Sequence, residues 1–140
     1  MNIIQIDNWR DYRRDGEQFL HTATAAYSKK KRAFSTDTLY NVTCMAIEKL
    51  IMAFLMKNGD LAENHTMADL LRALELHLGE IPELAEKLMY LDTFQEICSL
   101  ENFTIQIPSE EDVVKMLAIG EDVRAMLRPY LYEQKQTITQ

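Results

Sequence analysis

Apolar residues recur at helical spacing over most of the chain, and the most apolar stretch is Leu39–Met56. From 42 to 56, almost every position is apolar except Thr43, Glu48 and Lys49. A helix with apolar residues on more than one face must be covered from several sides. We therefore expect the central helix of a soluble bundle, with some apolar surface left for a second subunit. The stretch is too short and too charged to match a membrane span of about 20 consecutive apolar residues.

The segment before this stretch predicts a first helix. Apolar and aromatic residues recur at three- and four-residue steps from Trp9 to Tyr27, and Asp7 is placed to cap the helix. Its end falls at the basic run 28–32, where cations favour the negative end of a helix dipole. Ser35, Thr36 or Asp37 then caps the central helix, which we expect to run to Asn58 and stop at Gly59.

Two more helices are predicted between residues 64 and 99. Thr66 and Asp69 form a capping-box-like start to the third helix, and Gly79 closes it. Its inward positions are Met67, Leu70, Leu71, Leu74 and Leu78. Pro82 suits the first turn of a fourth helix, which we expect to end near Ser99. Its apolar side carries Ile81, Leu84, Ala85, Leu88, Leu91, Phe94 and Cys98.

The last helix follows an extended loop at 101–108. Ser109 caps it, and the acids of Glu110–Asp112 complement the dipole in its first turn better than they would serve as metal ligands, since neighbouring helix positions point in different directions. Its stripe is Val113, Leu117, Gly120, Val123, Leu127 and Leu131. Pro129 should kink or end it, and 133–140 has the character of a frayed tail. The expected fold is all-α: one domain over residues 1–140, an up-and-down helical bundle of four long helices plus one short helix.

The bulk composition excludes several function classes. A formal charge of −7 argues against non-specific binding to DNA or other phosphate backbones. Cys44 and Cys98 lie in apolar helical pattern and form neither a CxxC pair nor a zinc-spaced cluster, so we expect no metal and no cofactor. The start of the chain lacks the basic and apolar regions of a signal peptide, so the expected compartment is the reducing cytoplasm, without a membrane.

Several residues are candidates for ligand binding. His65, just before a helix, suits a general base or a phosphate contact, although supplementing the cap at Thr66 is the more frequent role. The basic run Lys29, Lys30, Lys31 and Arg32 would hold a nucleotide or RNA phosphate, or would simply be a solvated helix end. Glu48 and Lys49 are the only charges in the most apolar stretch and need a partner or an exposed window, which a subunit interface would supply.

The methionine line Met45, Met52 and Met56 has heptad-like spacing and favours packing or a dimer surface over a ligand pocket. His21 and His77 are isolated on helical pattern and are expected at the surface or at the boundary of the core.

The centre of the chain resembles a known family of helical domains. The resembling residues are Ala46-Ile47-Glu48-Lys49, Ala53, Gly59, His65-Thr66 and Leu70-Leu71. They resemble the HEPN family, the higher eukaryotes and prokaryotes nucleotide-binding domains, in which an AEKxxKA-like helix precedes a loop and a His-Asp/Thr-like helix start. The resemblance covers about residues 8–132, because the order of five helices also agrees. It implies a dimerising helical bundle with a role in nucleotide or RNA transactions.

The resemblance also points to a degenerate active loop. Met52 stands where the family often has a Lys, and many members are ribonucleases with an Arg, a polar residue, three further residues and a His between the last two long helices. On this chain, Glu101 falls at the Arg position, Asn102 at the polar position and Gln106 at the His position. Glu101 would repel a phosphate and Gln106 cannot titrate, which removes charge stabilisation and acid–base help. No catalytic residue is therefore assigned by the family motif.

Three functions follow as expectations. The first is a non-catalytic HEPN-like homodimer that binds a nucleotide, RNA or a nucleotidyltransferase-type partner. A toxin–antitoxin-like system would be its setting. The second is a ribonuclease or nucleotide-processing subunit that uses Arg72 with His77, Arg14 with His21, or His65 with the basic run. The third is a helical scaffold whose methionine-rich face binds another protein.

Overall fold

A computed structural model describes residues 5–29, 34–94 and 107–132. These ranges contain five helices and no strand, which confirms the all-α class. The helices are α1 (Trp9–Ser28), α2 (Thr36–Lys57), α3 (Met67–Leu78), α4 (Pro82–Asp92) and α5 (Glu110–Leu131). The predictions made for Lys30, Lys31, Arg32, Cys98, the loop at 101–106 and the tail lie outside the described residues.

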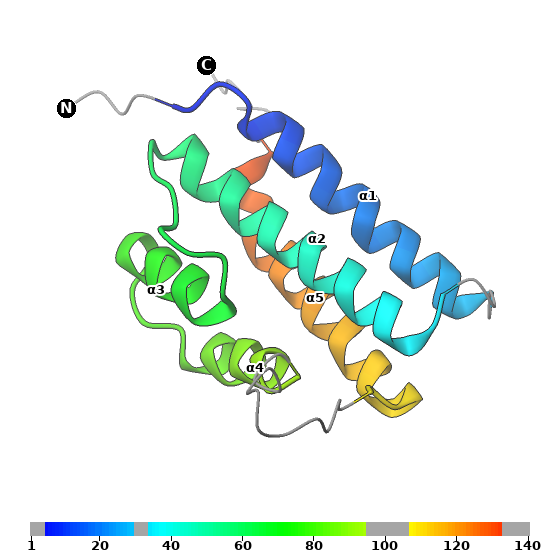
Figure 1. Ribbon diagram of the computed structural model, residues 1–140. Coiled ribbons are helices and arrows are strands. Elements are labelled where there is room, and N and C mark those ends of the chain that lie inside the picture. The colour runs from blue at the N-terminus through cyan, green and yellow to red at the C-terminus, as the bar shows by residue number, and fades with distance from the viewer. Residues whose placement is uncertain (1–4, 30–33, 95–106, 133–140) are drawn as a thin grey trace, which may run out of the picture.

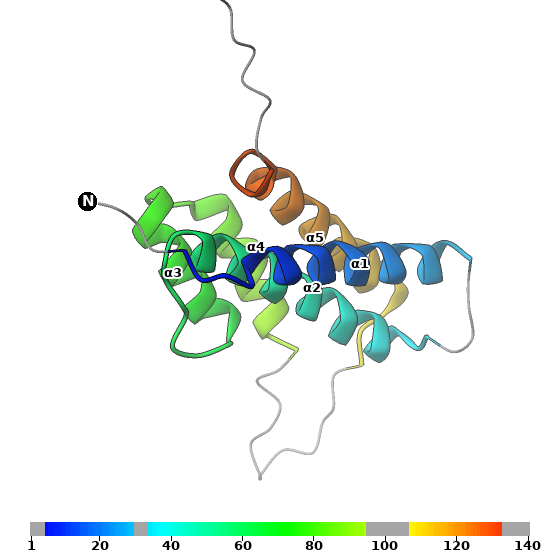
Figure 2. The ribbon, with the colours of Figure 1, turned by 90° about the horizontal axis from the view of Figure 1, so that it is seen from above.

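The three long helices form the body of the molecule. Helix α1 runs antiparallel to α2, and α5 lies along α2 in the same direction (Figure 1). Helices α3 and α4 pack on α2 and α5, on the side away from α1. Figure 2 shows α3 and α4 gathered toward the end of the bundle at which α1 begins. The two short helices together fill the fourth position of the bundle and return the chain to the start of α5.

The fourth helix is shorter than predicted, with 11 residues and an end at Asp92 rather than near Ser99. The hydroxyl of Thr93 donates to the Tyr90 carbonyl at 2.6 Å, which occupies a helix carbonyl from the side. The Phe94 N–H bonds the Leu91 carbonyl at 3.3 Å in a tighter turn, and the Phe94 ring packs against Tyr90 with centroids 5.4 Å apart. These local hydrogen bonds and the ring contact accompany the end of α4, although the apolar spacing continues beyond it.

The apolar surplus of α2 is buried within the chain. Every residue from Leu50 to Met56 is at most 4% exposed, and Met45 is the one large apolar side chain of α2 that remains exposed, at 44%. The methionine line therefore splits, with Met52 and Met56 in the core. The expected apolar surface for a second subunit is accordingly small on this helix. By length and composition alone α2 could cross a membrane, contrary to the prediction from its charges, but 72% of its apolar window is buried inside the protein.

Glycine allows α1 to approach α2 closely. A Cβ at Gly16 would lie 2.8 Å from the Leu50 Cγ and 3.1 Å from the Ala46 carbonyl oxygen. One turn further along α1, a Cβ at Gly120 of α5 would lie 2.7 Å from a terminal methyl of Leu20. The absence of a side chain at both positions lets the three long helices share one tightly packed seam.

Most helix ends are those predicted. The side chain of Ser35 accepts from the Thr38 N–H at 3.2 Å and so caps α2. Ser109 forms a complete capping box at the start of α5, whereas Thr66 caps α3 with a partial box. Gly59 and Gly79 end α2 and α3 with φ of 73° and 81°, a conformation that favours glycine.

Two predictions about caps are wrong or incomplete. Asp7 does not cap α1, whose first flanking residue is Asn8 and which has no side-chain cap. Instead, the Ile6 N–H donates to the Met56 carbonyl at 2.9 Å and ties the start of α1 to the end of α2. Asp92 adds a cap that sequence spacing does not reveal: its carboxylate accepts from the N–H groups of Met67 and Ala68 at the start of α3, at 3.3 and 3.2 Å.

Candidate functional site

Two of the candidate residues, 17 positions apart in the chain, lie in contact. Glu48, in the middle of α2, pairs through Oε1 with Nδ1 of His65 in the loop before α3. Glu48 therefore has a partner in its own chain, not across a subunit interface as anticipated. Among the described residues, the side chain of His65 bonds Glu48, while the side-chain cap of α3 comes from Thr66. The pair is exposed, with side chains 31% and 60% accessible, so it adds little to stability.

Lys49 points to another part of the surface. Its Nζ lies 4.4 Å from the centroid of the Tyr12 ring on α1. Adjacent helix positions differ by about 100° in direction, which separates Lys49 from Glu48. The structure thus divides the candidates of the central helix into two contacts, Glu48 with His65 and Lys49 with Tyr12. They do not form one pocket.

The first alternative nuclease pair, Arg72 with His77, does not converge. The guanidinium of Arg72 pairs with Asp69 at 3.4 Å, while His77 Nε2 bonds Asp60 at 2.9 Å. The contact with His77 lowers the pKa of the Asp60 carboxyl. His77 also lies edge-on to the buried ring of Phe54, with centroids 5.7 Å apart. Both side chains are therefore occupied by separate carboxylates.

The second pair, Arg14 with His21, is also divided. Arg14 is held by Asp11 at 3.4 Å and by Asp15 at 3.5 Å. His21 lines a hollow of about 210 Å³ between α1 and α5, which also contains Arg124. The Arg124 Nε donates to Glu17 at 2.6 Å, and this bond raises the pKa of Arg124. A phosphate in this hollow would meet an arginine whose charge is already neutralised.

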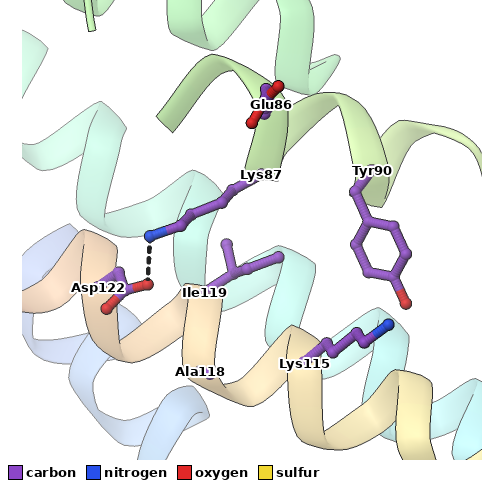
Figure 3. Close-up of a pocket in the computed structure, with 7 residues that line it drawn as sticks. All are labelled: Glu86, Lys87, Tyr90, Lys115, Ala118, Ile119 and Asp122. Atoms are coloured by element: carbon purple, nitrogen blue, oxygen red, sulfur yellow. Dashed lines mark hydrogen bonds and ion pairs between the residues drawn. The ribbon is translucent and has the colours of Figure 1, made fainter. Parts of the chain in front are cut away.

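A groove of about 340 Å³ lies between α4 and α5. Figure 3 shows Lys87 reaching from α4 to Asp122 on one side of Ile119, with Tyr90 and Lys115 on the other. The Lys87 Nζ is 2.7 Å from the Asp122 carboxylate, a contact that raises the pKa of Lys87. The raised pKa means that Lys87 is not an available base near neutral pH. The sequence did not predict this groove.

Tyr90 closes one side of the groove as a fixed hydrogen-bond donor. Its hydroxyl donates to the Asp112 carboxylate at 2.7 Å. Burial, followed by this bond, raises the pKa of Tyr90 to about 12. The Asp112 pKa is lowered, first by its bond with the Ser109 N–H and then by the bond with Tyr90. The phenol therefore stays protonated, and the groove is suited to binding rather than to proton transfer.

Cations gather where α1 begins and where α2 and α5 end, three helix ends that lie together in Figure 1. The guanidinium carbons of Arg10 and Arg13 lie 4.4 and 5.3 Å from the Trp9 ring centroid, and the Lys57 Nζ lies 4.9 Å from it. Arg128 belongs to the same edge by helix spacing. It follows Arg124 by one turn, and Arg124 pairs with Glu17, itself one turn after Arg13. We refer to Arg10, Arg13, Lys57 and Arg128 as the basic corner.

The basic corner was missed by the sequence analysis. Its one local signal is the arginine that directly follows each aromatic residue in Trp9-Arg10 and Tyr12-Arg13. Lys57 and Arg128 reach it only through the packing of α2 and α5. Of the basic run that was predicted instead, Lys29 is the exposed flanking residue at the end of α1, and the rest lies outside the described residues, as do Glu101, Asn102 and Gln106. Within the described ranges, no three His, Cys, Asp or Glu side chains are grouped to hold a metal ion.

Cys44 provides a prediction about reactivity. Burial raises the pKa of its thiol to about 12. The chain has two cysteines, so in a Cys98→Ser variant the only thiol is Cys44. At pH 8 we expect no reaction with a chromogenic aromatic disulfide in the folded protein and full reaction in denaturant.

Because the folded pKa is raised, the contribution of Cys44 to stability is complete below about pH 8.5 and is lost as the pH rises toward 12. Rapid labelling of the folded protein would contradict this burial.

Comparison with protein families gives a match over most of the chain. The HEPN domain profile matches residues 9–130. No curated protein and no solved structure matches the chain. The matched segment starts with α1 and stops one residue before the end of α5, so it takes in all of the helices described above. The chain therefore belongs to the HEPN domain family.

Proposed function

We propose that this HEPN domain acts by binding a nucleotide or RNA and that it does not cleave its ligand by the ribonuclease mechanism of the family. The observation that carries the proposal is the state of the histidines. The chain has three, all within the described residues: His65 pairs with Glu48, His77 pairs with Asp60, and His21 lies in a hollow with a neutralised arginine.

Cleavage would need two groups at one phosphate. A cation would neutralise the phosphate while a histidine moves the proton of an attacking hydroxyl. Among the described residues, each arginine considered for this role, Arg14, Arg72 and Arg124, is held by carboxylates. At the family motif position, the chain has Glu101 and Gln106 in place of Arg and His. Binding without cleavage is the function compatible with both sets of residues.

The proposal extends to partners and context. A nucleotidyltransferase-type partner, a toxin–antitoxin-like system, a homodimer and a cytoplasmic location are each consistent with a HEPN domain. The homodimer is supported by the family resemblance alone, because the apolar surplus of α2 is used inside the chain.

The test combines melting temperature with product analysis on the same samples. We expect a panel of nucleotides and short single-stranded RNAs to include ligands that raise the melting temperature, because a ligand at 100 times its Kd stabilises the folded state by about 2.7 kcal/mol. We expect every RNA to remain intact. Cleavage that disappears in His21→Ala, His65→Ala or His77→Ala would establish the ribonuclease alternative and overturn the proposal. The absence of any shift across the panel would also count against it.

A further inference from the structure

Within the described parts of the chain, no carboxylate pairs with the cations of the basic corner. Among the described residues, Arg10, Arg13, Lys57 and Arg128 make no ion pair with a carboxylate, although Asp and Glu outnumber Lys and Arg in the chain by 22 to 15. Arg14, Arg72, Arg124 and Lys87 are all paired with acids. The basic corner is therefore a local concentration of positive charge on an acidic protein.

Part of this charge has a structural role. Arg13 donates to the Leu131 carbonyl at 2.7 Å, and Lys57 donates to the Tyr130 carbonyl at 2.6 Å, so both satisfy the carbonyl end of α5. The dipole at that end offers only about half a negative charge. Several full positive charges thus exceed what α5 can neutralise. The face of the Trp9 ring also attracts Arg10, whose guanidinium carbon lies 4.4 Å from its centroid.

Between the described residues, few of the donors of these side chains are used. A guanidinium carries five N–H donors and an ammonium three. Among the described residues, Arg13 and Lys57 each make one hydrogen bond, while Arg10 and Arg128 make none with their side chains. Arg10 lies over the Trp9 ring, 4.4 Å from its centroid, and is exposed to solvent. A guanidinium edge matches the oxygens of a phosphate in a bidentate arrangement.

Two half-exposed tyrosines lie beside these donors. Tyr130 is 45% and Tyr132 is 38% exposed. The Tyr132 ring stacks against Arg13, with 4.5 Å from the guanidinium carbon to the centroid, and the Tyr130 ring packs on Phe54 at 5.4 Å. Exposed rings supported from behind by such contacts are suitable platforms for a nucleobase, and stacking on an aromatic ring is tolerant of base identity.

We propose that the basic corner binds a nucleotide unit, with its phosphates on Arg10 and Arg128 and its base on Tyr130 or Tyr132, either as a free nucleotide or within a single RNA strand. This rests on the proposed function and assigns it a surface. Proteins that bind single-stranded nucleic acid combine cations, which contact the phosphates, with aromatic rings, on which the bases stack. Trp9, 2% exposed and covered by the cations, supports this surface rather than contacting the ligand.

Trp9 is also a built-in probe, since it is the only tryptophan in the chain. A ligand on the basic corner should change Trp9 emission, excited at 295 nm, in a saturable way. The three ligands to compare are inorganic tripolyphosphate, uridine triphosphate and a hexauridylate strand, which separate phosphate binding, free-nucleotide binding and RNA binding. Affinity for the strand should fall with salt, and each lost phosphate contact should reduce the slope of log K against log salt by about 0.7.

The decisive variant is Arg10→Gln with Arg128→Gln, which spares Arg13 and Lys57 and their bonds to α5. Its matched control is Arg72→Gln with Lys87→Gln, which removes the same charge on α3 and α4. By calorimetry we expect the first variant to bind the nucleotide or strand at least about tenfold more weakly, and the control to bind like the unaltered protein, at similar melting temperatures.

Other outcomes distinguish a wrong assignment of the basic corner from a wrong proposal of nucleotide or RNA binding. Equal affinity in both variants, with Trp9 emission unchanged, would place a bound nucleotide elsewhere and overturn the corner while leaving the proposed function intact. Binding of tripolyphosphate but not of the nucleotide or strand would reduce the corner to an anion site and overturn both. Absence of binding by all three ligands would also overturn both.

Discussion

Replacing Leu50 by alanine is expected to lower the free energy of unfolding by about 2–5 kcal/mol. Leu50 is fully buried in α2 and belongs to the main core cluster. The Leu50 side chain lies against Gly16 of α1, and glycine has no side chain to fill the cavity that the substitution leaves. Since whole domains are stable by about 5–15 kcal/mol, this is a large share of the total. Denaturant unfolding monitored by Trp9 emission and by circular dichroism measures the change.

The matched control is Leu76→Ala. Leu76 lies on α3 and is 80% exposed, so the same chemical change should stay within about 0.5 kcal/mol of zero. Equal losses at the two leucines would mean that α2 is not the centre of the core. A lower slope of unfolding free energy against denaturant in Leu50→Ala would instead indicate a change in compactness.

The second large effect is expected at Gly16. A Cβ there would meet the branch point of Leu50 and the backbone carbonyl of Ala46, neither of which can move easily. Overpacking of this kind costs about 1–3 kcal/mol, against roughly 1 kcal/mol that alanine gains over glycine in a helix. We therefore expect Gly16→Ala to destabilise the protein in denaturant unfolding.

Gly120→Ala is the matched control for Gly16→Ala. At that position a Cβ would meet a terminal methyl of Leu20, which a rotamer change can withdraw, so the helix gain should offset most of the cost. The double variant Gly16→Ala with Leu50→Ala gives a second check. Because Leu50 is what the new methyl strikes, the double loss should be smaller than the two single losses added together, by about 0.5 kcal/mol or more. Simple additivity would mean that α1 shifts away from α2 instead.

Much of the helical architecture could be predicted from local patterns. Helix caps depend on hydrogen bonds within a single turn, so the neighbouring residues are enough to predict them. This holds for the caps at Ser35, Thr66 and Ser109 and for the helix ends at Gly59 and Gly79. The end of α4 was mispredicted because the apolar period continues past Asp92 while Thr93 and Phe94 turn the backbone by bonds to the preceding turn.

The candidate site was predictable only in part. Glu48 and His65 were singled out separately, as a charge in an apolar helix and as a histidine before a helix. Their contact depends on how the loop after α2 folds back, which no spacing encodes. Lys49 was expected, like Glu48, at a subunit interface, but its Nζ lies over the Tyr12 ring on α1.

Apolar periodicity is enough to predict an all-α domain with an apolar central helix. The resembling residues pointed to the HEPN family, to which the profile match assigns the chain. Two features depend on how the helices pack. The apolar surplus of α2 is buried against its own neighbours, and Arg10, Arg13 and Lys57 lie around the Trp9 indole ring. The physical reason is range. Caps and apolar periods act over one or two turns, whereas these contacts join helix ends that come together only when the core packs.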